Sequence, residues 1–283
     1  MTEITSKEKM LEINKEQQIF YNDNKKGKNR ATRVWSYFRE TVLKSFRRGW
    51  NTNARIYELH KKWFGDLKGK KVLDLGVFYG NYLSMYLAEN SAEYVAIDLS
   101  EPGIKSVKKK LAVLDKPNTS ATVVDFLSDD FAHRDFDVIY AMGVLHHFSD
   151  PEVLVKRIKE VLKPGGIIVS YDPLQTSPPI KFLRTIYRPF QSDSKWEWPF
   201  SRKTIRLFKK EFDVLERKGI FGKSKYAILM NTLPISKKYV ERKAKEWVEY
   251  DWNNTSTSDK ALFACMHVSL LMRNPVANSE PSK

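Results

Sequence analysis

A glycine-bearing turn within residues 72–81, VLDLGVFYGN, is the first stretch whose residue types could do chemistry. The apolar run predicts a buried strand ending near Gly76, and a helix is expected just beyond Gly80. Glycine lets the backbone approach a ligand closely, because a Cβ would occupy that space. N–H groups at the helix N-terminus can bind a carboxylate or phosphate. Many α/β proteins have a glycine here, so the turn alone is a weak indication of a cofactor site.

Two aspartates stand at matching places further along the chain. Asp98 ends the apolar run 93–97, and Asp125 ends the run 121–124. An acid about 20 residues after a glycine turn can accept both ribose hydroxyls of a nucleoside, and adenine would lie beside it. Each aspartate alone is more simply explained as a helix cap or turn residue. Together with the glycine turn, the two acids favour a nucleoside-type cofactor.

Two adjacent histidines follow the next apolar run, 136–141. His146 and His147 are candidate general bases, His146 ahead of His147, because imidazole can remove a proton from a hydroxyl near neutral pH. The alternative is that one or both cap the following turn or pack against the core.

These residues need a scaffold that brings them together. Strand and helix patterns alternate over the middle of the chain, which is typical of parallel βαβ units in an α/β fold. Strands are predicted at 71–75, 93–97, 121–124, 136–141 and 166–171, and helices at about 80–90, 102–114 and 151–162. Because parallel strands end at one edge of the sheet, the glycines, aspartates and histidines are expected to share that edge.

At this point the chain resembles the class I S-adenosylmethionine-dependent methyltransferases, near the ubiquinone and menaquinone biosynthesis methyltransferases. The resemblance rests on VLDLGVFYG, AIDLS, VVDFL, YAMGVLHHF and VLKPGGIIVSYDP, in that order. It covers about residues 70–172 strongly and extends weakly to the last two strands. It implies a Rossmann-like seven-stranded sheet of order 3-2-1-4-5-7-6 with strand 7 antiparallel.

The resemblance also implies a cofactor, S-adenosylmethionine, with S-adenosylhomocysteine as product and no metal. The residues that would contact this cofactor are Asp74, Gly76, Gly80, Asp98, Leu99, Asp125, Phe126, Met142 and Gly143. Phe78 departs from the pattern, because the family usually has glycine there. Its side chain must either point away from the cofactor or reshape the pocket.

The flanks differ from this core. Residues 1–66 are expected to form an N-terminal helical extension, with helices at 33–50 and 54–64, and 67–273 the methyltransferase domain. This domain carries insertions at about 173–201 and 222–259, and 274–283 is expected to be a disordered tail. Later elements are predicted at 202–212 (helix), 213–221 (strand), 235–251 (helix) and 261–272 (strand).

The aromatic and proline-rich insertion 173–201 is read as a lid over the substrate or as a satellite core. Candidate substrate contacts, here and near the cofactor, are Tyr82, Tyr171, Arg184, Arg188, Trp196 and Trp198. The flanks are also basic: residues 1–70 carry a net charge of +9, residues 71–170 of −3 and residues 171–283 of +9, within a total of +15. This distribution favours an anionic substrate or surface for the flanks.

The sequence therefore predicts methyl transfer to a small-molecule acceptor, an oxygen of an anionic, aromatic or lipid-like metabolite. The chain is expected in the cytoplasm, with peripheral membrane contact through helix 33–50 as an option. RNA or tRNA methylation is one alternative, although residues 141–144, AMGV, lack the Asn/Asp-Pro-Pro-aromatic motif of base-amine methyltransferases. A non-catalytic methyltransferase-like scaffold is the other. The oligomeric state is left open.

Overall fold

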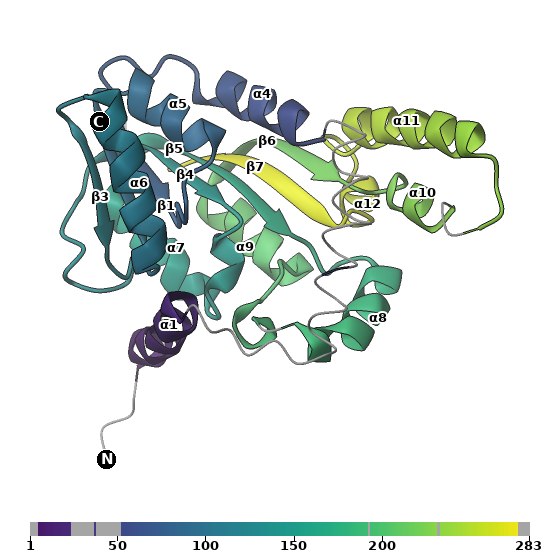
Figure 1. Cartoon of the computed structure of the whole chain (residues 1–283), viewed down its shortest axis with the longest axis horizontal. Coiled ribbons are helices and arrows are strands. Elements are labelled where there is room, and N and C mark those ends of the chain that lie inside the picture. Colours follow the sequence, from purple (N-terminus) through teal and green to yellow (C-terminus); the bar gives the residue numbers. More distant parts are fainter. Residues whose placement is uncertain (1–4, 24–36, 38–51, 192, 231–232, 277–283) are drawn as a thin grey trace, which may run out of the picture.

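The computed structural model of the chain describes residues 5–23, Tyr37, 52–191, 193–230 and 233–276. Its centre is a seven-stranded sheet of order β3-β2-β1-β4-β5-β7-β6 (Figure 1). The strands are β1 Lys71–Leu75, β2 Glu93–Asp98, β3 Thr119–Val123, β4 Phe136–Met142, β5 Leu162–Pro173, β6 Asp213–Ile220 and β7 His267–Arg273. Strands β1 to β5 pair in parallel, and β7 runs antiparallel to both neighbours. The predicted topology is confirmed.

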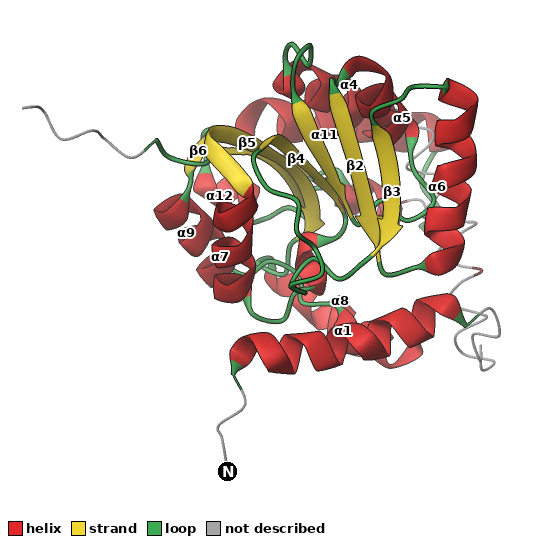
Figure 2. Cartoon of the chain, turned by 90° about the vertical axis from the view of Figure 1, so that its left-hand side faces the viewer, coloured by secondary structure: helices red, strands yellow, loops and turns green. Residues whose placement is uncertain are grey.

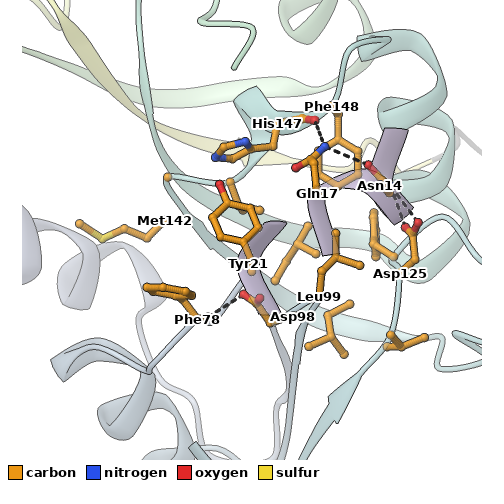
Figure 3. Close-up of a pocket in the computed structure, with 17 residues that line it drawn as sticks. Asn14, Gln17, Tyr21, Phe78, Asp98, Leu99, Asp125, Met142, His147 and Phe148 are labelled. Atoms are coloured by element: carbon orange, nitrogen blue, oxygen red, sulfur yellow. Dashed lines mark hydrogen bonds between the residues drawn. The ribbon is translucent and has the colours of Figure 1, made fainter. Parts of the chain in front are cut away.

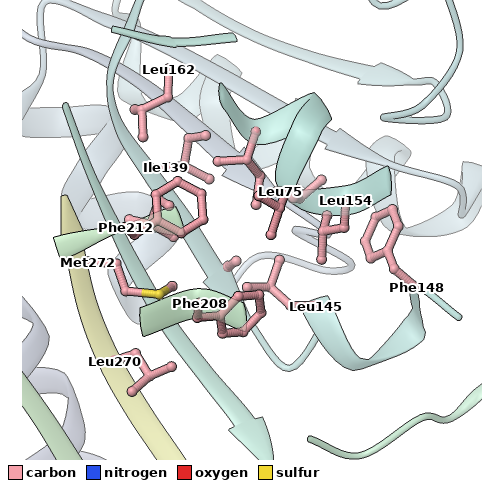
Figure 4. Close-up of a cluster of buried hydrophobic side chains, with 14 of the residues drawn as sticks. Leu75, Ile139, Leu145, Phe148, Leu154, Leu162, Phe208, Phe212, Leu270 and Met272 are labelled. Atoms are coloured by element: carbon pink, nitrogen blue, oxygen red, sulfur yellow. The ribbon is translucent and has the colours of Figure 1, made fainter. Parts of the chain in front are cut away.

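Successive apolar side chains on the central strands point to opposite faces of the sheet, and both faces are buried. On β1, Val72 packs with the helices of one face, and Leu73 and Leu75 pack with those of the other. The first face is covered by α4 Thr52–Phe64, α5 Tyr82–Asn90 and α6 Glu101–Leu114. The second is covered by α7 Pro151–Val161 and α9 Arg202–Glu211 (Figure 4). A sheet buried on both faces has continuous hydrophobic strands, which is why its strands could be predicted well.

The C-terminal part differs from the prediction in several places. The insertion after β5 contains a helix, α8 Pro178–Tyr187, whose prolines occupy the first turn, where proline is tolerated. The strand predicted over 261–272 is wrong at its start. Residues Asp259–Leu262 form helix α12, because the Ser258 side chain accepts a hydrogen bond from Ala261 N. Two further helices complete this part, α10 Lys225–Met230 and α11 Lys237–Asn254.

Helix α1, Ser6–Asn22, runs across the carboxyl-terminal edge of the sheet (Figure 2). It begins with a capping box in which Thr5 and Glu8 each bond the backbone of the other. Near its start Lys7 pairs with Asp129 at 2.8 Å. Near its end, the Asn22 side chain accepts a hydrogen bond from Glu101 N, at 2.9 Å. Contacts at both ends therefore hold α1 across this edge.

Two segments for which a prediction was made fall outside the described residues. These are the helix predicted over 33–50, apart from Tyr37, and the end of the C-terminal tail, 277–283. Asn274, at the start of that tail, is buried and donates from its side chain to Leu162 O at 3.0 Å. Among the described helices, none combines the length and apolar character needed to span a membrane.

Candidate active site

A cavity of about 300 Å³ lies at the carboxyl-terminal edge of the sheet, beneath α1 (Figure 3). Residues predicted from the sequence to contact a cofactor form much of its wall. Those that line it are Gly76, Asp98, Leu99, Asp125, Phe126, Met142 and Gly143, joined by His147. The strands position them, since Gly76 directly follows β1, Asp98 ends β2 and Met142 ends β4.

The Asp98 carboxylate is fixed by the loops that follow β1 and β2. One oxygen accepts the Phe78 N–H at 2.7 Å and the other accepts the Ser100 N–H at 2.8 Å. Burial raises the pKa of Asp98 above its ordinary value, although these backbone donors act in the opposite direction. A carboxylate oriented in this way retains further lone pairs, so it can accept the hydroxyls of a ribose.

Phe78 shapes the mouth of the pocket. Its φ of +48° lies in the left-handed region that glycine prefers, and the Gly103 backbone packs against it so closely that a Cβ there would lie 2.7 Å from Phe78 O. The ring lines the cavity and meets the Tyr21 ring edge-on, with centroids 6.3 Å apart. Phe78 thus adopts a backbone conformation that glycine prefers, while its ring forms part of the wall.

Two glycines leave room for a ligand or for close packing. A Cβ at Gly143, where φ is +74°, would meet no atom within 4 Å, so the backbone there adjoins open space. A Cβ at Gly76, where φ is +68°, would instead lie 2.4 Å from Val144 Cγ2. The Asp98 carboxylate, the apolar walls and the open space at Gly143 together suit a nucleoside-type ligand.

Asp125 is engaged by α1. The Asn14 side-chain amide donates to both of its oxygens, at 3.0 and 2.9 Å, and Leu127 N donates to one of them. Burial raises the pKa of Asp125, opposed by these hydrogen bonds. Gln17 reaches Asn14 Oδ1 at 3.2 Å and His147 O at 3.4 Å. Helix α1 is thereby hydrogen-bonded both to Asp125, just after β3, and to the backbone of His147.

Of the two histidines, His147 lines the cavity. Its Nδ1 lies 2.8 Å from Trp196 O, and since a carbonyl only accepts, Nδ1 carries the proton. Burial lowers the pKa of His147 to about 4, so the ring is neutral at pH 7. The second nitrogen, Nε2, is therefore unprotonated. The ring lies edge-on to Tyr21, with centroids 6.4 Å apart. This tautomer can accept a proton from a hydroxyl in the pocket.

His146 is not part of the lining. It is buried, and its Nδ1 contacts Asp172 Oδ1 at 2.9 Å, an oxygen that also accepts the His146 N–H. Burial lowers the pKa of His146, so this ring is neutral. The sequence put His146 ahead of His147 as a base. The arrangement places His147 at the cavity and His146 behind it, against the end of β5.

Four other predicted residues lie outside the lining. Asp74 is buried in β1 and accepts a hydrogen bond from Tyr94 OH at 2.7 Å. Gly80 turns the chain into α5, with φ of +71°. Tyr82 is 57% exposed and accepts a hydrogen bond from Lys61 Nζ. Tyr171 stacks on His267 with centroids 5.2 Å apart.

Of the residues of the insertion that were predicted to contact substrate, three bind the two histidines or other parts of the insertion. The Trp196 carbonyl holds His147, and the Trp198 N–H donates to His146 O at 2.7 Å. Arg188 donates to Ser194 O and Glu197 O, which ties the segment to itself. Arg184 is half-buried, and its charge helps lower the pKa of His146. None of these four side chains lines the cavity.

The lining residues missed from the sequence include three on α1: Asn14, Gln17 and Tyr21. With Met10, which is buried in the main core, they follow one another at steps of four, three and four residues. Such spacing places them on one helix face. Polar amides on the buried face of a helix were the available signal, since buried amides need partners.

A protein-family model described as "Methyltransferase domain" matches residues 48–213, more than half of the chain. Among curated proteins, the chain is 33% identical over 129 residues to a ubiquinone biosynthesis O-methyltransferase of Nitrosospira multiformis, covering 42% of this chain and 53% of that protein. It is 28% identical over 196 residues to a demethylmenaquinone methyltransferase of Staphylococcus aureus, covering 62% and 78%. The chain spans about half the length of the first of these relatives.

Solved structures share the fold at low identity. A geranyl diphosphate C-methyltransferase of Streptomyces coelicolor aligns with a TM-score of 0.55 and 13% identity, covering 78% of this chain and 77% of that one. YcgJ of Bacillus subtilis aligns with 0.53 and 16%, covering 79% and 99%. The [4+2]-cyclase SpnF aligns with 0.53 and 18%, covering 78% and 80%. The likeness to a cyclase means that the fold does not by itself define the reaction.

Proposed function

Because this chain belongs to the class I methyltransferase family, we propose that it transfers a methyl group from S-adenosylmethionine to an oxygen of a small-molecule acceptor. The observation that carries the proposal is that the Asp98 carboxylate and the neutral His147 ring line the same cavity. The first suits the ribose of the cofactor, and the second suits a proton on the acceptor.

The protein's part in this reaction is mainly alignment. S-adenosylmethionine, when bound, supplies a methyl group already activated by its sulfonium, so the bond to the acceptor oxygen forms as the bond to sulfur breaks. Asp98 orients the ribose, and the open space beside Gly143 admits the part of the cofactor next to β4. Helix α1 covers the cavity and limits its contact with water. Fixing donor and acceptor in line removes much of the entropic barrier.

The low pKa of His147 limits the kinds of acceptor oxygen from which this ring can take a proton. A base whose pKa is about 4 is poorly matched to an aliphatic hydroxyl, but it can relay the proton of a more acidic one. We therefore propose a phenolic or enolic oxygen. The curated ubiquinone biosynthesis O-methyltransferase gives independent support, since its name describes O-methylation.

A transfer assay with purified full-length chain tests this function. S-adenosylmethionine labelled on the methyl group would be incubated with catechols, other phenols, aromatic carboxylic acids, primary amines and a transfer RNA pool. Label in ether products of the phenols is the expected result. Label confined to amines, carboxylic acids or RNA would contradict a phenolic or enolic acceptor. No cofactor binding by folded protein would instead favour a scaffold in which Phe78 closes the pocket.

We also propose that the N-terminal extension serves as a lid through α1. Replacing Asn14 with alanine removes the donor to both Asp125 oxygens and the acceptor for Gln17. Losing one charge-assisted hydrogen bond of about 1.5 kcal/mol should speed dissociation of S-adenosylhomocysteine on the order of tenfold. Stopped-flow displacement measures this rate. The exposed neighbour Glu16→Ala is the control, and equal rates in both variants would argue against a lid.

A further inference from the structure

A second cleft, of about 590 Å³, lies between the start of α8, α9, α10 and α12. Helices α8, α10 and α12 gather at one end of the sheet (Figure 1). The cleft shares no lining residue with the cavity under α1. Its charged lining is almost entirely cationic: Arg202, Arg206, Lys209, Lys223, Lys225 and Lys260, against Asp259.

Among the described residues, three of the six lining cations have no carboxylate partner, whereas Lys225 is attracted by the buried Asp251 carboxylate. Within the described part of the chain, no carboxylate pairs with Arg202, Arg206 or Lys260. The single lining acid, Asp259, is shared between Lys209 and Arg217, so its charge is already matched. Mutual repulsion in such a cleft is relieved when an anion enters.

Three of the cations, Arg202, Lys223 and Lys225, are held in place by aromatic rings or by backbone carbonyls. The Arg202 guanidinium lies 4.3 Å from the centre of the Phe263 ring. Lys225 is buried and donates to the carbonyls of Gly222 at 2.8 Å and Ala264 at 2.6 Å. Lys223 lies 3.5 Å from the Tyr250 ring. An ordered set of donors costs less entropy on binding than mobile surface lysines.

Arg202 and Arg206 are spaced to act together. They are four residues apart on α9 and both line the cleft, so they lie on one helix face. Two guanidinium forks side by side match the oxygens of phosphate groups better than those of a halide or of one carboxylate. The hydroxyl of Ser177, the N-cap of α8, makes no side-chain capping bond and lies at the same cleft.

We infer that this cleft binds a phosphate-bearing ligand, at a site separate from the cavity under α1. The shared chemistry is a phosphate monoester or diester group seated between Arg202, Arg206 and Lys260. That group could belong to a soluble phosphorylated molecule or to a phospholipid head group. The inference does not depend on the proposed methyl transfer, because no residue of the cofactor cavity takes part.

Calorimetric titration of the full-length chain tests it, with inorganic pyrophosphate as the soluble probe and phosphatidylcholine vesicles with or without phosphatidic acid as the lipid probe. The double variant Arg202→Gln/Arg206→Gln should weaken whichever probe binds by at least about tenfold. The control, Lys203→Gln/Lys210→Gln, removes the same charge from the same helix at exposed positions outside the cleft. It should change affinity by no more than about twofold, because it loses only long-range attraction.

The two probes separate the sources. Pyrophosphate binding assigns a soluble phosphate ligand, whereas binding confined to phosphatidic acid vesicles assigns a head group. Equal weakening by the two double variants would overturn the inference, since only general charge would then matter. So would the absence of binding to both probes, or binding to an RNA oligonucleotide alone. Thermal melting of each variant is the test that its fold is intact, and this test does not depend on whether the chain binds S-adenosylmethionine.

Discussion

Replacing Asp98 with asparagine should weaken S-adenosylmethionine binding on the order of 10- to 100-fold. Asparagine has nearly the same shape, but it offers one oxygen where the carboxylate has two, and it carries no charge. The loss of one charge-assisted hydrogen bond to the ribose costs about 1.5–3 kcal/mol. The amide nitrogen also takes the place of the oxygen that accepts either the Phe78 or the Ser100 N–H, which loosens the loop after β1 or after β2.

Calorimetry with S-adenosylmethionine and S-adenosylhomocysteine measures this loss. Asp115→Asn is the matched control, because Asp115 is exposed at the end of α6 and its left-handed conformation suits asparagine. That variant should bind like the original chain. An Asp98→Asn variant that melts normally and binds the cofactor with unchanged affinity would remove Asp98 from the cofactor site.

Asp98 could be predicted because two independent signals coincide there. The β2 run is buried on both faces, so its hydrophobic residues are continuous and its end is sharp. A charged residue at the end of such a strand in an α/β sheet stands at the edge where ligands bind. The same reasoning places Asp125 and Met142 in the wall of the cavity. The sequence pattern marks where these strands end, and the pairing of β1 with both β2 and β4 brings strand ends together at one edge of the sheet.

The contribution of α1 could not be predicted in the same way. Asn14 and Tyr21 reach the cavity only because α1 crosses the ends of the strands. Asn14 and its partner Asp125 are more than a hundred residues apart in the sequence. No local pattern encodes that crossing. Helix α12 was missed for a different, local reason: the apolar residues that follow Ala261 suit a strand, but the Ser258 cap starts a helix there. The choice between His146 and His147 depends on Trp196 and Asp172, which are distant in sequence.

Replacing His147 with asparagine should lower kcat on the order of 10²- to 10⁴-fold, with little change in cofactor affinity. The asparagine amide nitrogen takes nearly the place of Nδ1, so it can still donate to Trp196 O. What is lost is Nε2, the atom available to accept the acceptor's proton, and a positioned base contributes a factor of this size. His133→Asn, at an exposed position outside the cavity, is the matched control and should keep full activity.

The pH dependence of the original chain separates a buried base from an ordinary one. The neutral ring is the active form, so activity is lost as the pH falls through the histidine's pKa. Because burial lowers that pKa to about 4, kcat/KM should stay level between about pH 5.5 and 8 and fall only towards pH 4. An acid limb centred near pH 6.5 would mean that a solvated histidine acts instead. In the His147→Asn variant the limb near pH 4 should disappear from kcat, measured at saturating S-adenosylmethionine so that protonation of Asp98 does not limit cofactor binding. Persistence of that limb would shift the base role to another residue, and the buried His146 beside Asp172 would be the next to replace.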